Sequence, residues 1–413
     1  MTHHEYLGRV SQIANSQATL DAARLKRTAF TRKPKMPFSS ALSFLLDMRK
    51  TTLQTRLNLY FQHTERCDPI SQQAFSKLRM NFDHSPFETM VRDCVEAEYS
   101  GQYELSLWCG FHVLAVDGSY LQLPRTDELR REYGVRGGGT LASAGVSVLY
   151  DVLHGWPLDP ILTHTDMNER SECEKHIRFL CEQLPHIAEK SILTLDRGYP
   201  SLDMFEKLQS SALKFVVRCS SKSVSEINMA ALGDSTVILK NGVCVRVIKF
   251  TLPNGDVETL ASNLSELPVQ ALLELYTFRW AVETAYFRLK QELCVEKFSG
   301  KTPNAIRQDF WASMVLMQAV AVFQRNADEA VQKRHKGKPV KHSYRARTSD
   351  LIVTLRDRFV FAVLCGRPMF CNKEMETVIK ILARTLSPVR PGRSYPRVFR
   401  PGDAVKMNLK SRL

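Results

Sequence analysis

The sequence predicts a mixed α/β protein with a helical N-terminal region and a β-rich segment inserted ahead of a long helix. Residues 110–219 first carry strand-like apolar runs and then alternate strands with amphipathic helices, which is typical of an α/β sheet with mixed pairing. Residues 1–100 show apolar positions at helical spacing. Residues 220–266 contain short β-branched runs separated by Asn-Gly pairs, a strong hairpin signal.

Length and composition limit the class of protein. A chain of 413 residues exceeds one ordinary core, so we expect two or three units. The longest apolar stretch, Trp311 to Phe323, is shorter than a membrane span and contains Gln318, so we predict a buried helix and no membrane partner. The first residues lack a secretory signal, and the ten cysteines contain no C-x-x-C pair. Both features predict reduced thiols in a cytoplasmic protein.

Positive charge is concentrated at the two ends of the chain. Residues 331–413 hold 20 Lys and Arg against 5 acids, and residues 1–100 hold 14 against 10. Residues 101–330 hold 23 against 28, so the centre is mildly acidic. This layout fits an extended anionic polymer that is held by the ends and processed in the middle. The alternative is a solvated surface with a basic tail.

The helical N-terminal region contains two basic features. Arg24 to Lys35 has six basic residues in twelve, which favours a phosphate-contacting arm or loop, with a disordered linker as the alternative. Ser71 is placed to cap a helix that exposes Lys77 and Arg79, two candidate DNA contacts. A helix-turn-helix and a plain helical bundle fit this segment equally well.

The remaining elements follow from the apolar pattern along the chain. A basic tail rich in Pro, Gly and Arg follows residue 331, and we expect it to be the least ordered part. Strands are expected at about 110–124, at 141–164 as a pair around the His154–Gly155 turn, at 190–199 and at 213–219, and helices at about 169–184, 201–212, 268–294 and 303–325.

The segment from Tyr276 to Lys290 is the most informative motif. It reads Y-x-x-R-x-x-x-E-x-x-x-x-x-x-K, and on one α-helix these four residues form a polar stripe about 60° wide. Taking each residue type at ordinary usage, the pattern should occur by chance in only about 0.2% of chains this long. The four stripe residues are Tyr276, Arg279, Glu283 and Lys290, and the apolar residues expected to bury the helix are Phe278, Val282, Ala285 and Leu289.

Two aspartates stand at the ends of apolar runs. Asp117 falls inside or at the end of the apolar run VLAV, and Asp196 ends the apolar run ILTL and is followed by Arg197. Together with Glu283 they make three carboxylates on separate elements, a ligand set suited to Mg²⁺ or Mn²⁺. Two such ions about 3.5–4 Å apart can activate an attacking oxygen and stabilise a leaving one. The sequence shows no Ser–His–Asp arrangement, P-loop or dinucleotide fingerprint that would indicate a different kind of active site.

These motifs resemble those of bacterial insertion-sequence transposases of the cut-and-paste DDE group marked by a Y-R-E-K helix. DGS at 117–119, LDRGYPS at 195–201 and YTFRWAVETAYFRLK at 276–290 resemble the three motifs of that group. EKFSGKTPNAIRQDFWA at 296–312 and PGRSYPR at 391–397 are also similar to family segments. The similarity runs over most of residues 60–400, and it is weak toward the N-terminus.

The resemblance implies a domain plan and a reaction. It implies an RNase H-like catalytic domain at 106–325 with its β-rich insertion at about 220–266. From the residue patterns on either side we expect a helical DNA-binding domain at 1–105 and a basic C-terminal region at 326–413. Water would cleave a phosphodiester at the end of the element, and the freed 3′-hydroxyl would then attack DNA. The implied partners are double-stranded DNA with terminal inverted repeats, target DNA and a second copy of the chain on DNA, in the bacterial nucleoid.

The resemblance also implies a role for each motif residue. Asp117, Asp196 and Glu283 would be the catalytic residues and would bind two divalent ions. Tyr276, Arg279 and Lys290 would hold DNA phosphates near the transposon end, and Arg197 and Trp280 are further candidate DNA contacts.

Three questions stay open at the level of sequence. Some relatives stack a flipped base on a Trp of the insertion, but none of the tryptophans at 108, 156, 280 and 311 lies in 220–266. Trp280 is therefore interpreted chiefly as a helix-packing residue, with a base contact as the alternative. The alternative functions are a catalytically silent DNA-binding regulator and a stand-alone metal nuclease.

Overall fold

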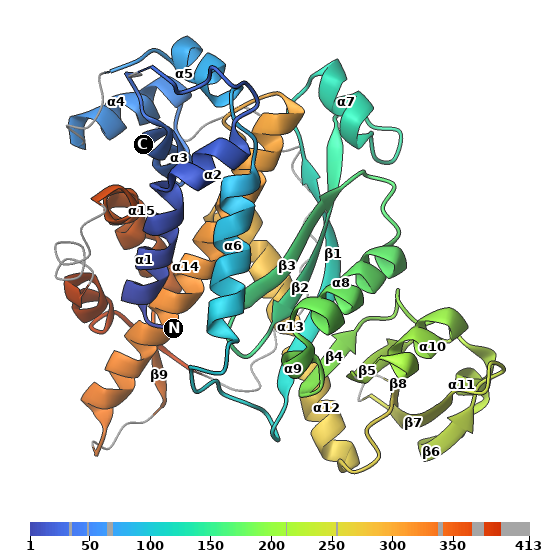
Figure 1. The fold of residues 1–413 in the computed structure, drawn as a ribbon. Helices are drawn as coiled ribbons and strands as arrows, with labels where there is room; N and C mark the ends of the chain where they lie inside the picture. The colour runs from blue at the N-terminus through green and yellow to red at the C-terminus, as the bar shows by residue number, and fades with distance from the viewer. Residues whose placement is uncertain are drawn as a thin grey trace. The chain divides into compact units, whose positions relative to one another are not determined.

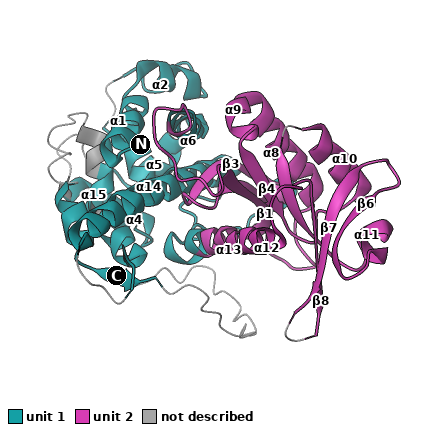
Figure 2. Ribbon diagram, turned by 90° about the horizontal axis from the view of Figure 1, so that it is seen from below, with its two compact units in different colours: residues 1–97, 122–132, 288–413 teal, residues 98–121, 133–287 magenta. Residues whose placement is uncertain are grey.

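The computed structural model describes the chain except residues 33–34, 48, 64–68, 212, 253–254, 338–341, 366–375 and 390–413. The chain forms two compact units (Figure 2). Unit 1 contains residues 1–97, 122–132 and 288–413, and unit 2 contains residues 98–121 and 133–287. The three predicted domains follow other boundaries and stay a prediction.

Unit 2 is built on one mixed eight-stranded sheet with the order β3-β2-β1-β4-β5-β8-β7-β6 (Figure 1). The pairs β1–β4 and β4–β5 are parallel, whereas β2–β3, β5–β8, β7–β8 and β6–β7 are antiparallel. This mixed α/β architecture confirms the α/β part of the predicted fold class. The strands are β1 His112–Gln122, β2 Ser143–Asp151, β3 Trp156–Thr163, β4 Ser191–Leu195, β5 Lys214–Cys219, β6 Gly233–Ile238, β7 Cys244–Thr251 and β8 Val257–Ser262.

Helices pack on both faces of this sheet because neighbouring strand residues point to opposite sides. Val216 of β5 joins the core cluster that buries Leu272 and Leu275 of α12. The adjacent Phe215 contacts Phe205 of α10 instead, so α10 and α12 lie on opposite faces. The helices of unit 2 are α8 Glu169–Gln183, α9 Pro185–Ala188, α10 Leu202–Ser210, α11 Ser225–Met229, α12 Val269–Phe278 and α13 Trp280–Phe287.

The predicted β-rich segment forms β6, β7 and β8. These strands make an antiparallel meander, and β8 pairs with β5, so the segment extends the same sheet. Gly242 adopts a φ of 82° in the β6–β7 turn, a conformation that favours glycine and explains the Asn241–Gly242 signal. Asn254 of the second Asn-Gly pair lies outside the described residues.

Unit 1 is largely helical and is organised around α14, Pro303–His335. This helix is almost completely buried from Ala305 to Phe323, which confirms the buried helix predicted around Trp311. None of the helices in the described part of the chain is both long and apolar enough to cross a membrane. The other elements assigned to this part of the fold are α1 His3–Ala14, α2 Gln17–Ala23, α3 Phe38–Leu45, α4 Leu53–His63, α5 Gln72–Arg79, α6 Ser85–Glu98, α7 Asp127–Tyr133, η1 Arg288–Glu292, β9 Tyr344–Ala346, α15 Thr348–Cys365 and β10 Leu386–Pro388.

The N-terminal predictions have mixed outcomes. Ser71 caps α5 by accepting a hydrogen bond from the backbone of Ala74, as predicted. The parts of the basic segment that are described, residues 24–32 and 35, form turns, bends and a β-bridge at Arg24, and no helix. Residues 64–68, which join α4 to α5, lie outside the described residues, so the helix-turn-helix alternative stays a prediction.

The C-terminal region is more ordered than the basic composition suggested. Helix α14 runs to His335 and α15 covers Thr348–Cys365, so the expectation of little order after residue 331 is wrong for these segments. The apolar face of α15 explains its order, because Leu351, Leu355 and Phe359 are fully buried. The Pro- and Arg-rich segment from residue 390 lies outside the described residues.

The predicted single helix over 276–290 is wrong in its last turn. Helices α12 and α13 are separated only by Arg279, whose backbone dihedral angles remain helical, so Tyr276, Arg279 and Glu283 keep close to the expected spacing. From Arg288 to Glu292 the chain winds instead as a π-helix, η1. A π-helical turn holds more residues than an α-helical turn, so the stripe angle calculated for Lys290 does not apply.

Candidate active site

The two predicted aspartates occupy equivalent positions on neighbouring strands. Strand β1 runs parallel to β4, with Ala115 opposite Thr194. Asp117 and Asp196 each lie two residues further along, and residues two apart on a strand point to the same side. Because paired strands lie about 4.8 Å apart, this register brings the two carboxylates side by side where β4 ends.

Arg279 joins these aspartates to the third predicted carboxylate. Its Nη2 lies 2.9 Å from Oε1 of Glu283 and 3.7 Å from Oδ2 of Asp196. The hydroxyl of Tyr276 donates to Oδ1 of Asp196 at 3.2 Å. Charge interactions couple Asp117 to both Arg279 and Glu283. Carboxylates from two separate elements of unit 2 therefore pair with one guanidinium group, and Asp117 lies close enough to interact with its charge.

Burial and the neighbouring charges shift the pKa values in this cluster. Burial raises the pKa of Asp117 to about 6; Arg279 and the backbone N–H of Gly118 oppose the rise, while Glu169 and Glu283 add to it. Burial also raises the pKa of the Tyr276 hydroxyl. For Arg279, burial acts to lower the pKa, but Tyr276 and the surrounding carboxylates outweigh burial and raise it. The site thus holds more acidic groups than its one buried cation can neutralise.

The predicted DNA contacts near this cluster differ in exposure. Only 2% of Arg279 is exposed, and its guanidinium faces carboxylates, so its contact with a phosphate stays a prediction. Trp280 is 54% exposed, so our interpretation of it as a helix-packing residue is wrong and the base contact remains. Lys290 belongs to unit 1, and its role toward the carboxylates of unit 2 also stays a prediction.

Arg197 is exposed directly after Asp196. It lines a cleft of about 480 Å³ on unit 2, together with Arg218 and Lys249. Arg218 lies 3.9 Å from Oδ1 of Asp196 and also pairs with Glu258. Asp256 and Glu258 line the same cleft, so its basic residues are partly neutralised, and the DNA contact by Arg197 stays a prediction.

Arg79 is buried in unit 1, which contradicts the prediction that α5 exposes it. Its side chain donates to the side chains of Gln308, Ser299 and Asp309 and to the carbonyl oxygen of Ala305, at 2.8–3.1 Å. With 3% of its surface exposed, Arg79 holds α5 to the start of α14. Lys77, two residues earlier, is exposed as predicted.

One residue beside the aspartates was missed from the sequence. Glu169 begins α8, and its carboxylate lies against Gly118 and Gly198, one and two residues after Asp117 and Asp196. An acidic residue in the first turn of a helix is common because it interacts favourably with the helix dipole. Nothing in the local sequence therefore distinguished Glu169 from an ordinary helix start.

Two buried polar clusters lie elsewhere in unit 2. Ser147, His176 and Asp159 do form a Ser–His–Asp chain, with distances of 2.9 and 2.6 Å, which the sequence did not reveal. All three residues are buried, so no substrate can reach the serine, and we interpret the chain as a connection of α8 to β2 and β3.

The second cluster consists of His112, Asp151 and His154, whose polar atoms lie within 4.8 Å of one another. Nδ1 of His154 lies 2.8 Å from Asp151, and its Nε2 accepts from the backbone of Ser106. This tautomer directs the Nδ1 proton at Asp151. We therefore interpret this cluster as a hydrogen-bonded turn.

Comparison with known proteins identifies the family. The model of the family described as transposase DDE domain matches residues 108–317, just over half of the chain. The chain belongs to this family. The resemblance to insertion-sequence transposases stated from the motifs is thereby confirmed.

Curated relatives of this DDE family member match over parts of their length. The transposase InsG of insertion sequence element IS4 from Escherichia coli is 25% identical over 239 residues, 52% of each chain. The protein y4zB of Sinorhizobium fredii is 32% identical over 89 residues, 22% of this chain and 24% of y4zB. The chain thus spans about half of InsG and less of y4zB.

A solved structure is also similar. It contains the piggyBac transposase in a synaptic complex with hairpin DNA, and the match has a TM-score of 0.48 at 12% identity. It covers 94% of this chain and 84% of the other chain.

Proposed function

We propose that this DDE family member is a transposase that cleaves phosphodiesters at the ends of an insertion sequence and joins the freed 3′-hydroxyl to DNA. One observation carries the proposal: Asp117, Asp196 and Glu283, the acidic residues of the three family-like motifs, gather around the guanidinium of Arg279. Carboxylates that repel one another are stable together only near positive charge.

The carboxylates suit the divalent cations on which the DDE family depends. Their oxygen atoms are the ligands that Mg²⁺ and Mn²⁺ prefer, and they already surround one cationic group. Asp117, Asp196 and Glu283 would hold the metal, which we infer to be two ions. When bound, such ions activate an attacking oxygen and stabilise the charge of the leaving group.

The other residues of the cluster would position these ligands. Tyr276 holds Asp196 through its hydroxyl, and Tyr286 donates to the backbone oxygen of Asp117 at 2.7 Å. Arg279 neutralises the carboxylates and could turn to a DNA phosphate when cations replace it. Arg197, Lys290 and Trp280 would extend the contact with DNA.

We infer that the sheet of unit 2 is an RNase H-like core. The order β3-β2-β1-β4-β5, in which β1, β4 and β5 are parallel, supports this assignment. The strands β6 to β8 would then be the β-rich insertion. The proposed partners are DNA with terminal inverted repeats, target DNA and a second copy of the chain, and we propose that the protein works in the nucleoid.

The test is cleavage of the DNA that flanks the coding sequence. Full-length protein with end-labelled duplexes and Mg²⁺ should nick the boundary of an inverted repeat and then join the end to a plasmid. Asp196→Asn should lower nicking at least about a hundredfold while DNA binding is kept, because the amide would hold the divalent cations that activate the attacking oxygen more weakly than the carboxylate does. Asp203→Asn, an exposed substitution on α10, is the matched control.

Each outcome decides between the candidate functions. Nicking without end preference or joining would indicate a stand-alone nuclease, and end-specific binding without nicking would indicate a silent regulator. Full cleavage by Asp196→Asn would show that the site assignment is wrong.

A further inference from the structure

The carboxylate of Glu169 lies between the two segments that carry the paired aspartates. A β-carbon added to Gly118 would lie 3.1 Å from its Oε1, and one added to Gly198 would lie 2.9 Å from its Oε2. At Gly118 the added atom would also lie 2.9 Å from Cε of Met167. A side chain at either position would force the carboxylate of Glu169 to shift, so the glycines of DGS and DRG leave room for it in its present position.

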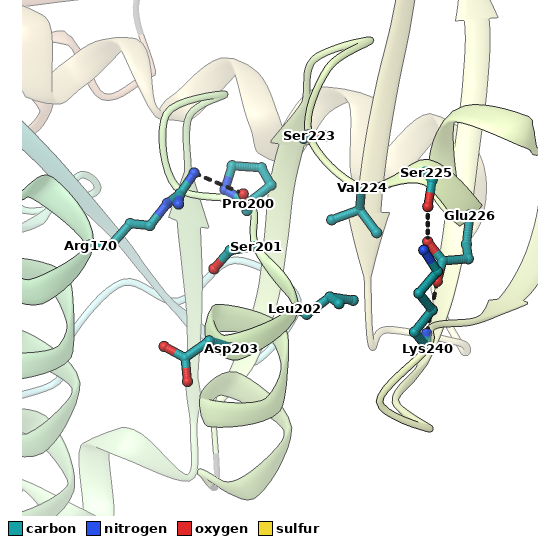
Figure 3. Close-up of a pocket in the computed structure, with 10 residues that line it drawn as sticks. All are labelled: Arg170, Pro200, Ser201, Leu202, Asp203, Ser223, Val224, Ser225, Glu226 and Lys240. Carbon is teal, nitrogen blue, oxygen red and sulfur yellow. Dashed lines mark hydrogen bonds between the residues drawn. The ribbon is translucent and has the colours of Figure 1, made fainter.

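The start of α8 fixes the position of this side chain. Asn168 caps the helix by accepting from the backbone of Arg170 at 3.0 Å. The guanidinium of Arg170 donates to the carbonyl oxygens of Gly198 at 3.2 Å and Pro200 at 3.1 Å, and Figure 3 shows it pointing to Pro200. The bonds of Arg170 tie the helix to the loop after Asp196, and the cap fixes where the helix begins, so Glu169 is held beside that loop.

Glu169 has no hydrogen-bond or ion-pair partner in the part of the chain that the structure describes. Arg170 and Lys175 on the same helix bond elsewhere, to the 198–200 loop and to Glu172. Its charge instead acts against that of Asp117. A half-buried carboxylate directed at another carboxylate destabilises the fold unless a cation neutralises both.

A second observation points to a ligand at the same place. Tyr199 is only 1% exposed, and its hydroxyl has no hydrogen-bond partner among the described residues. Asp117 and Glu169 lie close enough to act electrostatically on this hydroxyl. A buried hydroxyl without a partner loses free energy, so the position indicates that a bound ion or its water completes the site.

We propose that Glu169 is a fourth carboxylate of the metal site and helps Asp117 to hold a divalent cation. The inference rests on the proposed function, since it adds a ligand to the site formed by Asp117, Asp196 and Glu283. It assigns a role to a residue outside the three family-like motifs. It also gives a reason for the two motif glycines that lie against this carboxylate.

Binding of Mn²⁺ to the full-length protein, measured by calorimetry, tests this proposal without relying on activity. Glu169→Gln should weaken binding about 10-fold or more, the loss typical for supporting ligands. Glu169→Asp, which keeps the charge, should restore part of the affinity. Glu182→Gln is the matched control, because Glu182 is an exposed residue on the same helix.

Thermal unfolding separates a metal role from a structural one. Without divalent cation, Glu169→Gln should melt at the same temperature as the parent protein or above it, because the repulsion of Asp117 is removed. With Mg²⁺ the parent should gain stability by mass action and the variant should gain less. A variant that melts lower without cation and gains as much with it would overturn the proposal.

The motif variants distinguish failure of this inference from failure of the proposed function. If Asp117→Asn and Asp196→Asn lose Mn²⁺ binding while Glu169→Gln binds like the parent, only the role of Glu169 is wrong. If Asp117→Asn and Asp196→Asn also bind Mn²⁺ like the parent, the cation site of the proposed function is wrong as well.

Discussion

Arg79 in unit 1 and Arg279 in unit 2 are both buried arginines beside acidic residues, but their surroundings differ. Each side-chain nitrogen of Arg79 donates to an acceptor, and its partner Asp309 is only 9% exposed. Nε of Arg279 has no hydrogen-bond partner among the described residues. Its partners Asp196 and Glu283 are 29% and 32% exposed.

This difference separates a structural ion pair from a site that can exchange its cation. Around Arg79 every polar group is satisfied within the protein, so another ion has neither room nor free ligands. Around Arg279 the carboxylate oxygens outnumber the N–H groups that reach them, and solvent has access. The comparison therefore predicts that divalent cations act on one region and leave the other unchanged.

The largest expected effect is the loss of Arg79. Arg79→Met leaves the charge of Asp309 buried without its partner, so the free energy of unfolding should fall by about 3–5 kcal/mol. Adding Mg²⁺ should not restore it, as measured by urea denaturation with and without the cation. Arg279→Met should cost less, and Mg²⁺ should recover the loss because the cation can replace the guanidinium. Equal responses of the two variants to Mg²⁺ would contradict the comparison.

A smaller effect is expected from Asp117→Asn and depends on pH. Because its pKa is raised to about 6, ionised Asp117 destabilises the fold above pH 6, and this cost disappears as the pH falls toward the ordinary value of 3.8. Without divalent cation, the variant should gain about 3 kcal/mol of stability at pH 7.5. The gain should shrink between pH 6 and pH 4, as followed by chemical denaturation across this range.

Asp309 is a control for this prediction, because its pKa is shifted in the opposite direction to that of Asp117. Burial acts to raise its pKa, but the charges of Arg79 and Lys50 outweigh burial and lower it. A lowered pKa stabilises the fold above the ordinary value and loses that contribution as the pH falls through the folded value. Asp309→Asn should therefore be destabilised at pH 7.5. A gain for Asp309→Asn, or a pH-independent gain for Asp117→Asn, would refute these assignments.

The smallest effect on stability is expected at Lys77, two residues from Arg79 on the same helix. Lys77→Gln should change the free energy of unfolding by less than about 0.5 kcal/mol, because the side chain is exposed. If Lys77 contacts a phosphate, the slope of log DNA affinity against log salt should fall by about one, as measured by fluorescence anisotropy. An unchanged slope would remove Lys77 from the DNA interface.

The local sequence pattern was sufficient to predict most strands of the sheet and the three motif carboxylates. Apolar runs placed β1 to β5 within a few residues, because the period of a buried strand depends only on neighbouring residues. Asp117 and Asp196 were found because each interrupts or ends such a run. Glu283 was found because the spacing of its motif survives the short break at Arg279.

Long-range packing determined the surroundings of Arg79 and Glu169, which the sequence pattern did not predict. Arg79 looked exposed because its helix face is polar, but its partners lie some 220 to 230 residues away along the chain. The local sequence did not mark Glu169 as a site residue. Its proposed role depends on Gly118 and Gly198, which the sheet register and the position of α8 bring beside it. The sequence by itself determined the residue types, their order and the local periods that predict helices and strands. Which charges face one another depends on how distant segments meet in three dimensions, and no local period encodes that meeting.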